Sequence, residues 1–396
     1  MGRFFARAMK AWSWILLIVL SIAIKWVSWY PWWIEKNYSR GFYPELTKWF
    51  RIFLGWLPFS VGDIFYLLVI LGVLYKTIFF FRHIKQKKTD RAFYVKAMQE
   101  TIFFFLFAYV LFNICWGLNY QRKGIASQLD LKVAPYTTVE LDSLTSQLQQ
   151  RANYYSSQFT LAQRDSLWRK RTLFSQASSI FQKASNQYSY LSYAEPSIKP
   201  SLFSYIGDYV GFQGYYNPFS GEGQVNTTIP IFLQPYVTTH EIAHQLGYAS
   251  ESEANFVGYL VCRANGSASF RYSMYFDLYR YALAELYDRD STRAIAIAKN
   301  TAPQIKSDVQ QLKTFYKSYK NPFSEIIWWG YDHFLKANDQ PNGNRSYNEV
   351  IAWLMAYTRK YGKEALQLEF ILPHHALNRF VGLIAVFRIF LLIVRN

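Results

Sequence analysis

Two histidines and a glutamate within one short stretch are the residues best suited to chemistry in this chain. His240 and His244 are four residues apart, and Glu241 directly follows the first of them. Residues four apart share one face of a helix, so both imidazoles can reach one metal ion while the carboxylate lies beside its open coordination position. This H-E-x-x-H pattern is typical of zinc hydrolases, in which the glutamate is the general base. The sequence therefore predicts a catalytic zinc centre at residues 240–244.

The residues that follow contain two candidates for a third zinc ligand. Gly247 predicts the end of the first helix, because glycine adopts a positive φ without steric cost, and Ser250 with Glu253 forms a capping-box pattern that predicts the start of a second. A catalytic zinc site takes three protein ligands and leaves one position for water. Glu253 already has the capping role, whereas Glu251 has Asn255 four residues on, at the spacing of a ligand and its supporting partner. We select Glu251 as the ligand and keep Glu253 as the alternative.

Together these two motifs resemble those of the gluzincin peptidases. Residues 251–258 resemble most the third-ligand helix of the membrane-bound CaaX prenyl-protein endopeptidase group, which has the pattern E-x-x-A-D. This resemblance implies that Glu251 binds zinc and that Asn255, standing where the group has Asp, orients a zinc-binding histidine. Residues 214–247 resemble an uncharacterised family of bacterial membrane-anchored proteins with a gluzincin-like motif. That likeness extends from the membrane segments to about residue 363.

The composition of the chain indicates a membrane protein. It has 396 residues, a formal net charge of +17 and 20% aromatic residues, which is too basic and too hydrophobic for an average soluble enzyme. Apolar residues are concentrated in three N-terminal stretches, at about 12–33, 61–81 and 101–118, each close to the length of a membrane span. The first can also be interpreted as a signal peptide, but no small-residue cleavage site follows it. We therefore predict three transmembrane helices.

The distribution of positive charge predicts the orientation of these helices. Arg3, Arg7 and Lys10 precede the first stretch. Six more basic residues follow the second, namely Arg82, Lys85, Lys87, Lys88, Arg91 and Lys96. Because positive residues stay on the cytoplasmic side, the N-terminus should be cytoplasmic and the chain after Leu118 periplasmic or otherwise extracytoplasmic, at the bacterial inner (plasma) membrane. Beside apolar spans this charge suits the lipid bilayer and its anionic headgroups, so we predict no nucleic-acid partner.

The remaining residues predict an α+β, mostly helical domain of zincin-like type. We expect residues 1–118 to form the transmembrane region, 119–365 the extracytoplasmic metallopeptidase domain and 366–396 an apolar tail. Within this tail, residues 380–394 suit a fourth span, an interfacial helix or a buried helix. Cys115 and Cys262 are not expected to pair.

Helical and strand patterns alternate along the predicted domain. Helices are expected at 138–156, 160–186, 269–287, 291–299, 302–319, 322–336 and 347–361, with short strands between 198 and 228. Residues 224–228 are a candidate edge strand that would pair with an extended substrate backbone, or else an ordinary strand of the sheet.

These patterns favour a zinc metallopeptidase that hydrolyses peptide or protein substrates in the cell envelope. Zn²⁺ lowers the pKa of its bound water to about 7, and Glu241 would take the proton from that water. Tyr331, His333 and Tyr347 are candidate donors to the oxyanion, of which we select Tyr347. Three alternatives remain: a zincin-like binding or signalling module without turnover, a receptor-like membrane protein with an incidental histidine pair, and a transporter.

Overall fold

A computed structural model describes residues 2–338, 340, 349–362 and 366 of the chain. The chain forms two compact units, Met1–Ala356 and Tyr357–Asn396, and all features below belong to the first. The boundary between the units falls within helix α17 (Val350–Tyr361), and the division into residues 1–118, 119–365 and 366–396 stays a prediction. Tyr347 and the apolar residues 380–394 lie outside the described residues, so their assignments stay predictions.

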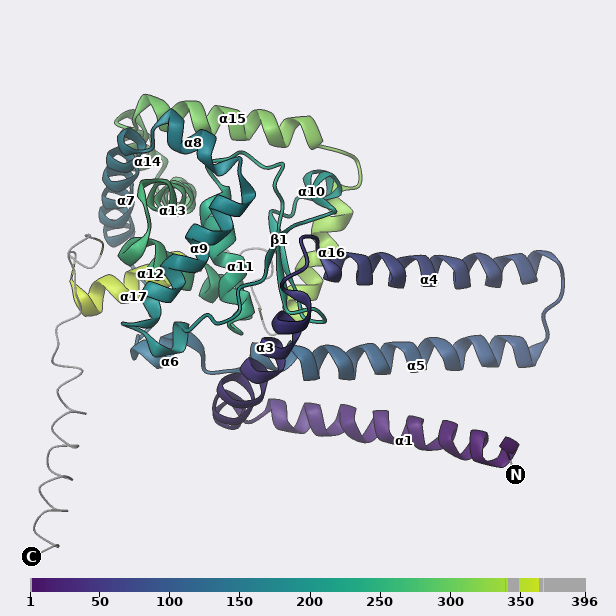
Figure 1. The fold of residues 1–396 in the computed structure, drawn as a ribbon. Helices are drawn as coiled ribbons and strands as arrows, with labels where there is room; N and C mark the ends of the chain where they lie inside the picture. The colour runs from purple at the N-terminus through teal and green to yellow at the C-terminus, as the bar shows by residue number, and fades with distance from the viewer. Residues whose placement is uncertain (1, 339, 341–348, 363–365, 367–396) are drawn as a thin grey trace, which may run out of the picture. The chain divides into compact units, whose positions relative to one another are not determined.

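Three long apolar helices near the N-terminus confirm the three predicted apolar stretches. They are α1 (Gly2–Ser28), α4 (Val61–Lys85) and α5 (Arg91–Cys115), and each contains a segment long and apolar enough to cross a membrane. Their bounds differ from those predicted: α1 ends at Ser28, three residues before Pro31 begins a new helix, and α5 begins at Arg91. In Figure 1 the turn between α4 and α5 lies at the end of these helices away from β1 and α11.

The segment between the first two apolar helices is a helical element that sequence analysis did not assign. It consists of α2 (Pro31–Trp33), the π-helix η1 (Ile34–Phe42) and α3 (Tyr43–Leu54). The Tyr38 hydroxyl donates to the carbonyl of Ile114 at the end of α5 (3.0 Å), and the Tyr43 hydroxyl donates to the carbonyl of Gln245 (3.0 Å). This segment therefore joins the end of an apolar helix to the H-E-x-x-H helix.

Six helical elements lie between α5 and the sheet. They are η2 (Gly117–Gln121), α6 (Gly124–Leu129), α7 (Thr138–Gln158), α8 (Leu161–Leu167), α9 (Lys170–Ser185) and η3 (Ser189–Leu191). Helix α7 confirms the predicted helix at 138–156, but the single helix predicted at 160–186 is wrong. Arg169 has extended backbone (ψ 94°), which ends α8 and turns α9 so that Lys170 can donate to Gln234 Oε1 (2.9 Å). The two residues at this break, 168 and 169, are neither Gly nor Pro, so the sequence pattern gave no sign that the helix ends there.

The helices after the metal motif agree with the sequence. They are α13 (Ala268–Arg289), α14 (Ser291–Lys299), α15 (Pro303–Tyr319) and α16 (Ser324–Ala337). The helix predicted at 347–361 is described from Val350 as α17. Helix α13 packs along α7, where the rings of Tyr155 and Tyr275 stack at 5.6 Å. This packing forms a helical layer behind the candidate site.

A small sheet of three strands lies in the predicted strand region. It contains β1 (Ile198–Pro200), β2 (Gly214–Asn217) and β3 (Glu222–Val225), with helix α10 (Ser204–Val210) between the first two strands. The strand order is β1-β3-β2, with β1 parallel and β2 antiparallel to β3. The proposed edge strand at 224–228 is therefore wrong, because β3 is central and pairs on both sides. Residue spacing shows a strand but not its place in a sheet.

The strand at the sheet edge nearest the motif is β2. Asn226 N–H donates to the Gln213 carbonyl (2.9 Å), which makes these residues a hydrogen-bonded pair. Bonded pairs alternate along an antiparallel ladder, so the backbone groups of Gly214 and Tyr216 point away from β3. The other end of the sheet is joined to α4, since Glu222 Oε2 accepts from Gly62 N–H (2.7 Å). The sheet thus links an apolar helix to the candidate site.

Candidate metal centre

The predicted metal motif lies on a buried helix, α11 (Gln234–Gln245). Pro235 occupies its first turn, where proline costs no hydrogen bond. Gly247 ends it as predicted: its φ is +82°, its N–H donates to the His244 carbonyl (2.9 Å), and Tyr248 N–H donates to the Ala243 carbonyl (3.2 Å). This pair of bonds is a Schellman motif. It turns the chain sharply so that α12 (Glu251–Asn265) packs against α11.

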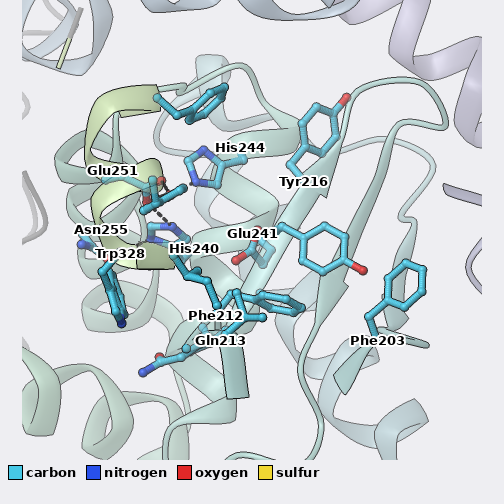
Figure 2. Close-up of a pocket in the computed structure, with 18 of the residues that line it drawn as sticks. Phe203, Phe212, Gln213, Tyr216, His240, Glu241, His244, Glu251, Asn255 and Trp328 are labelled. Carbon is cyan, nitrogen blue, oxygen red and sulfur yellow. Dashed lines mark hydrogen bonds and ion pairs between the residues drawn. The ribbon is translucent and has the colours of Figure 1, made fainter. Parts of the chain in front are cut away.

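Three side chains from these two helices converge on one point. Ligand atoms of His240, His244 and Glu251 lie within 4.8 Å of one another, and all three residues are buried. Glu251 Oε2 is 3.1 Å from His240 Nε2 and 3.6 Å from His244 Nε2. Figure 2 shows the three side chains turned toward each other, with Glu241 between them and the strand that carries Tyr216. The structure thus brings together the three residues selected from the sequence.

The outer nitrogens of both imidazoles are held by oxygen acceptors. His244 Nδ1 lies 2.7 Å from the carbonyl of Tyr248, and His240 Nδ1 lies 2.8 Å from Asn255 Oδ1. A carbonyl oxygen only accepts, so each ring carries a proton on Nδ1 and turns its Nε2 toward Glu251. Asn255 therefore occupies the place expected of a residue that orients His240.

This arrangement fits a zinc ion. Two imidazoles and one carboxylate are a zinc donor set that leaves a position for water. Glu251 Oε2 is buried and has no hydrogen-bond partner among the described residues, although both Nε2 atoms lie near it. Burial disfavours the charge on Glu251, but the two histidines outweigh this and hold the pKa of the carboxyl well below its usual range. Burial likewise opposes protonation of His244, and Glu251 overcomes it to raise the pKa of His244 to about 9.

Glu241 lies beside this cluster in a different environment. Its side chain is buried, and burial raises the pKa of its carboxyl to about 7 although both histidines oppose the shift. Oε2 has no hydrogen-bond partner within the described part of the chain. A Cβ atom at Gly214 would stand 2.4 Å from Glu241 Oε1, so the bare backbone of β2 makes room for the carboxylate. Glycine within a strand signals such a close approach of another group to the backbone.

The alternative ligand, Glu253, points away from the cluster. Its Oε1 accepts from Ile125 N–H (2.9 Å) in the first turn of α6, and it occupies the space that a side chain at Gly124 would need. The predicted capping box at Ser250 and Glu253 is also wrong, because Ser250 makes no side-chain cap and bonds the Ser252 hydroxyl instead (2.9 Å). The Glu253 carboxylate therefore bonds the N–H of Ile125, and not the backbone N–H of Ser250 that the capping-box spacing predicts.

Of the two candidate oxyanion donors that the structure describes, Tyr331 lies at the cluster and His333 does not. The Tyr331 hydroxyl donates to Glu251 Oε1 (3.0 Å). His333 is exposed and its Nδ1 lies 2.8 Å from the Trp329 carbonyl, while Tyr347 lies outside the described residues. Sequence analysis also missed Arg280, which lines the same pocket and pairs with Asp277 (2.6 Å). Its spacing to the motif gives no signal, because α13 reaches the pocket only through tertiary packing.

The end of α11 is supported by side chains from the N-terminal third of the chain. Trp116 Nε1 donates to the His244 carbonyl (3.3 Å), and Arg122 Nη1 donates to the carbonyls of Leu246 (3.3 Å) and Gly247 (3.0 Å). Arg122 also forms a buried ion pair with Glu35 (2.9 Å). A cation at a helix C-terminus satisfies carbonyls that have no partner in the helix. The apolar helices and the metal centre are therefore joined through α11.

Comparisons with known proteins identify a family but no activity. The family described as Protein of unknown function (DUF3810) matches residues 38–355. No curated protein matches the chain. No solved structure matches it either.

Proposed function

We propose that this chain, which belongs to the DUF3810 family, is a membrane-anchored zinc metallopeptidase with a gluzincin-like site. One observation carries the proposal: His240, His244 and Glu251 converge on one point, while Glu241, whose Oε2 has no hydrogen-bond partner among the described residues, lies beside it in the same pocket. An unpartnered carboxylate next to a metal donor set is costly for stability unless it acts on a ligand. This combination also favours turnover over a binding or signalling module that has lost activity.

The chain's own residues would divide the chemistry as follows. His240, His244 and Glu251 would hold Zn²⁺, which when bound would supply a water of lowered pKa and polarise the scissile carbonyl. Glu241 would accept a proton from the attacking water and pass it to the leaving amine, a task suited to a carboxyl with a pKa of about 7. Asn255 keeps the His240 ring in the ligating tautomer. The Tyr331 hydroxyl, already beside Glu251, would donate to the developing oxyanion.

An extended peptide would bind along β2. The backbone groups of Gly214 and Tyr216 point away from β3, and both residues line the pocket that contains the metal cluster. An added strand pairs with such an edge through backbone bonds alone, so recognition there does not depend on the substrate's side chains.

The metal content and activity of two variants test this function. The full chain, purified in detergent, should bind one equivalent of zinc and cleave a mixed quenched-fluorescent peptide library. His240→Ala should lose the zinc, whereas Glu241→Gln should keep it and lose about 10²- to 10⁴-fold in kcat. Asp288→Asn, at an exposed acid of α13, is the matched control. Full activity in Glu241→Gln would refute the mechanism, and a zinc-loaded wild type without hydrolysis would favour the inactive module.

We further propose that the site faces the periplasm or cell exterior, with a cytoplasmic N-terminus. The basic residues between α4 and α5 support this orientation, because they lie at the end of these helices away from the metal cluster. Thiol labelling of single cysteines tests this orientation. The cysteines are placed at Gln86 and at Ser157, in a protein that lacks Cys115 and Cys262. An impermeant thiol reagent should label position 157 in intact cells or spheroplasts and spare position 86. The reverse pattern would place the site in the cytoplasm.

A further inference from the structure

Two helices that line the pocket, α10 and α16, expose large apolar side chains on their outer surface. We call these the α10–α16 patch: Leu202, Tyr205, Tyr209, Phe323, Ile326 and Trp329, each at least 52% exposed. Asn321 Nδ2 donates to the Tyr209 carbonyl (2.8 Å), which joins the two helices into one surface. Large apolar patches on a protein surface mark sites of interaction with another protein or with a membrane. The α10–α16 patch therefore needs a partner, and its place in the fold indicates which.

The α10–α16 patch lies level with the start of the candidate span α4. Leu202 N–H donates to Asp63 Oδ2 in the first turn of that helix (2.7 Å). The candidate span begins at Val61, so this bond joins the patch to the first turn of a segment apolar enough to cross a membrane. In Figure 1, α10 and α16 lie on the side of the first unit from which α4 extends. A bilayer crossed by α4 would therefore have its surface where the patch lies.

A second group of exposed aromatic residues lies at the same end of the apolar helices. It falls between the end of α1 and the start of α4, and each member is at least 42% exposed: Trp29, Tyr30, Trp32, Trp33, Trp49, Phe53, Trp56 and Phe59. Lys199 Nζ donates to the Gly55 carbonyl (2.6 Å), so this segment is also joined to the sheet. Trp and Tyr gather where a protein meets the headgroup region of a bilayer. Two segments remote in sequence thus place the same residue types at one level, which favours a membrane over a protein partner.

The charges next to α16 also suit a membrane surface. Lys317 and Lys320 are exposed just before the helix, and Glu325 is the exposed acid of its first turn. Asp332 is paired with Lys336 within the helix (2.6 Å). Basic residues beside an apolar helical face favour the headgroup region, because anionic lipids attract them there. Helix α16 therefore has the composition of a helix that lies in the membrane interface.

Helix α16 carries the patch and a residue of the candidate site on different sides. Ile326 and Trp329 are about one turn apart and exposed, whereas the Tyr331 hydroxyl donates to Glu251 Oε1 (3.0 Å). Within this helix, all of which the structure describes, Leu335 is the buried residue. Most of the stability of a helix in a protein comes from covering its apolar face. Covering the patch would therefore hold α16 in place and keep Tyr331 at the metal cluster.

We propose that the α10–α16 patch docks into the headgroup region of the leaflet that α4 enters, and that this contact keeps α16 in place as a wall of the pocket. The partner is the lipid bilayer itself. Docking of the patch does not depend on the proposed peptidase function. Its effect on turnover rests on that function, because Tyr331 would donate to the developing oxyanion. The candidate site is then complete only when this surface lies against a membrane.

Quenching of a single fluorophore by lipid measures docking without turnover. Ile326 and Ile295 are the matched positions, since both are exposed isoleucines and α14, which carries Ile295, lies away from α4 in Figure 1. Each is replaced by Cys in the full chain lacking Cys115 and Cys262, labelled with NBD and reconstituted in nanodiscs of phosphatidylcholine and phosphatidylglycerol. A nitroxide on the lipid headgroup should quench the label at 326 about threefold or more strongly than the label at 295.

Two results of this measurement would overturn the inference. Equal quenching at the two positions would mean that the patch does not reach the bilayer. A label at 326 that is shielded from water but not quenched by the lipid nitroxide would assign the patch to a protein contact.

A charge placed in the patch tests the effect of docking on the site. Ile326→Asp should lower the quenching of an NBD label at position 329 to the level found at 295, because a charge opposes burial of the apolar face, and Ile295→Asp should leave it unchanged. With zinc bound, Ile326→Asp should also lower kcat about 10- to 100-fold, within the loss caused by removing one oxyanion donor. Wild-type kcat in an Ile326→Asp protein that no longer docks would refute the effect on the site. If the wild type hydrolyses no peptide, the quenching still decides whether the patch docks.

Discussion

Two buried clusters of charge flank the last turns of α11, and they shift the pKa of a buried carboxyl group in opposite directions. At the metal cluster, burial raises the pKa of Glu241 to about 7, and one of its oxygens has no hydrogen-bond partner among the described residues. At the end of α11, burial is outweighed by Arg122, and the pKa of Glu35 is lowered to about 2. Both Glu35 oxygens are hydrogen-bonded, to Arg40, Arg122 and Gln128.

The difference shows which cluster has a structural role. A fully bonded ion pair satisfies its own charges and fixes the elements that carry them, here η1, the chain before α6 and the end of α11. An unpaired buried carboxylate lowers stability and is retained where it acts on a ligand. Glu251 and Glu253 also differ in role only two residues apart, since one faces two histidines and the other a backbone N–H.

The largest expected effect separates these two glutamates. Glu251→Ala should lower zinc affinity at least 10²- to 10³-fold, because structural zinc sites supply roughly 3–5 kcal/mol per ligand. Glu253→Ala should leave zinc affinity within threefold, since its carboxylate bonds Ile125 N–H in α6. Competition with a chromophoric chelator measures both affinities. A larger loss in Glu253→Ala would exchange the roles of the two residues.

The second prediction concerns the Glu35 and Arg122 pair and its pH dependence. The pKa of Glu35 lies at about 2 in the folded protein, below its usual value of 4.5, so its contribution to stability is present above pH 4.5 and is lost as the pH falls toward 2. This shift corresponds to about 3 kcal/mol. Glu35→Gln should lower the free energy of unfolding by about that amount at pH 7, and its difference from wild type should shrink below pH 4.5.

Denaturant unfolding in detergent, followed by tryptophan fluorescence at pH 7, 4.5 and 3, measures this difference. Glu45→Gln is the control, because Glu45 follows in the next helix and its side chain is 69% exposed. A constant gap between Glu35→Gln and wild type at all three pH values would mean that the pair does not govern acid stability.

The sequence predicted one of these clusters well and gave no sign of the other. His240, His244, Glu251 and Asn255 lie on two consecutive helices, so helical spacing and the stop at Gly247 brought them into one group that also included Glu253. The helices and the strand region followed from apolar periodicity for the same local reason. Glu35 and Arg122 are 87 residues apart, and no local pattern relates them.

Tertiary placement accounts for the errors within the predicted site as well. Residues 224–228 have strand character, but the pairing of β3 with both neighbours decides that β2 is the edge. Ser250 and Glu253 have the spacing of a capping box, yet α6 packs close enough for Ile125 to take the carboxylate. Residue spacing predicts hydrogen-bond partners within one helix, but it does not show when a neighbouring helix supplies the partner instead.

The smallest expected effect tests how β2 positions the unpaired carboxylate of Glu241. Gly214→Ala would put a Cβ atom 2.4 Å from Glu241 Oε1 and 2.9 Å from the Gln224 carbonyl, so the carboxylate must move. A displacement of about 1 Å at a catalytic group costs up to about 10²-fold, and we expect kcat to fall about 10- to 100-fold. Zinc content should not change, because the ligands lie on α11 and α12. Gly330→Ala is the control, since a Cβ there meets nothing within 4 Å. Wild-type kcat in Gly214→Ala, with zinc bound, would show that Glu241 is not held by the edge strand and would remove the main structural difference between the two clusters.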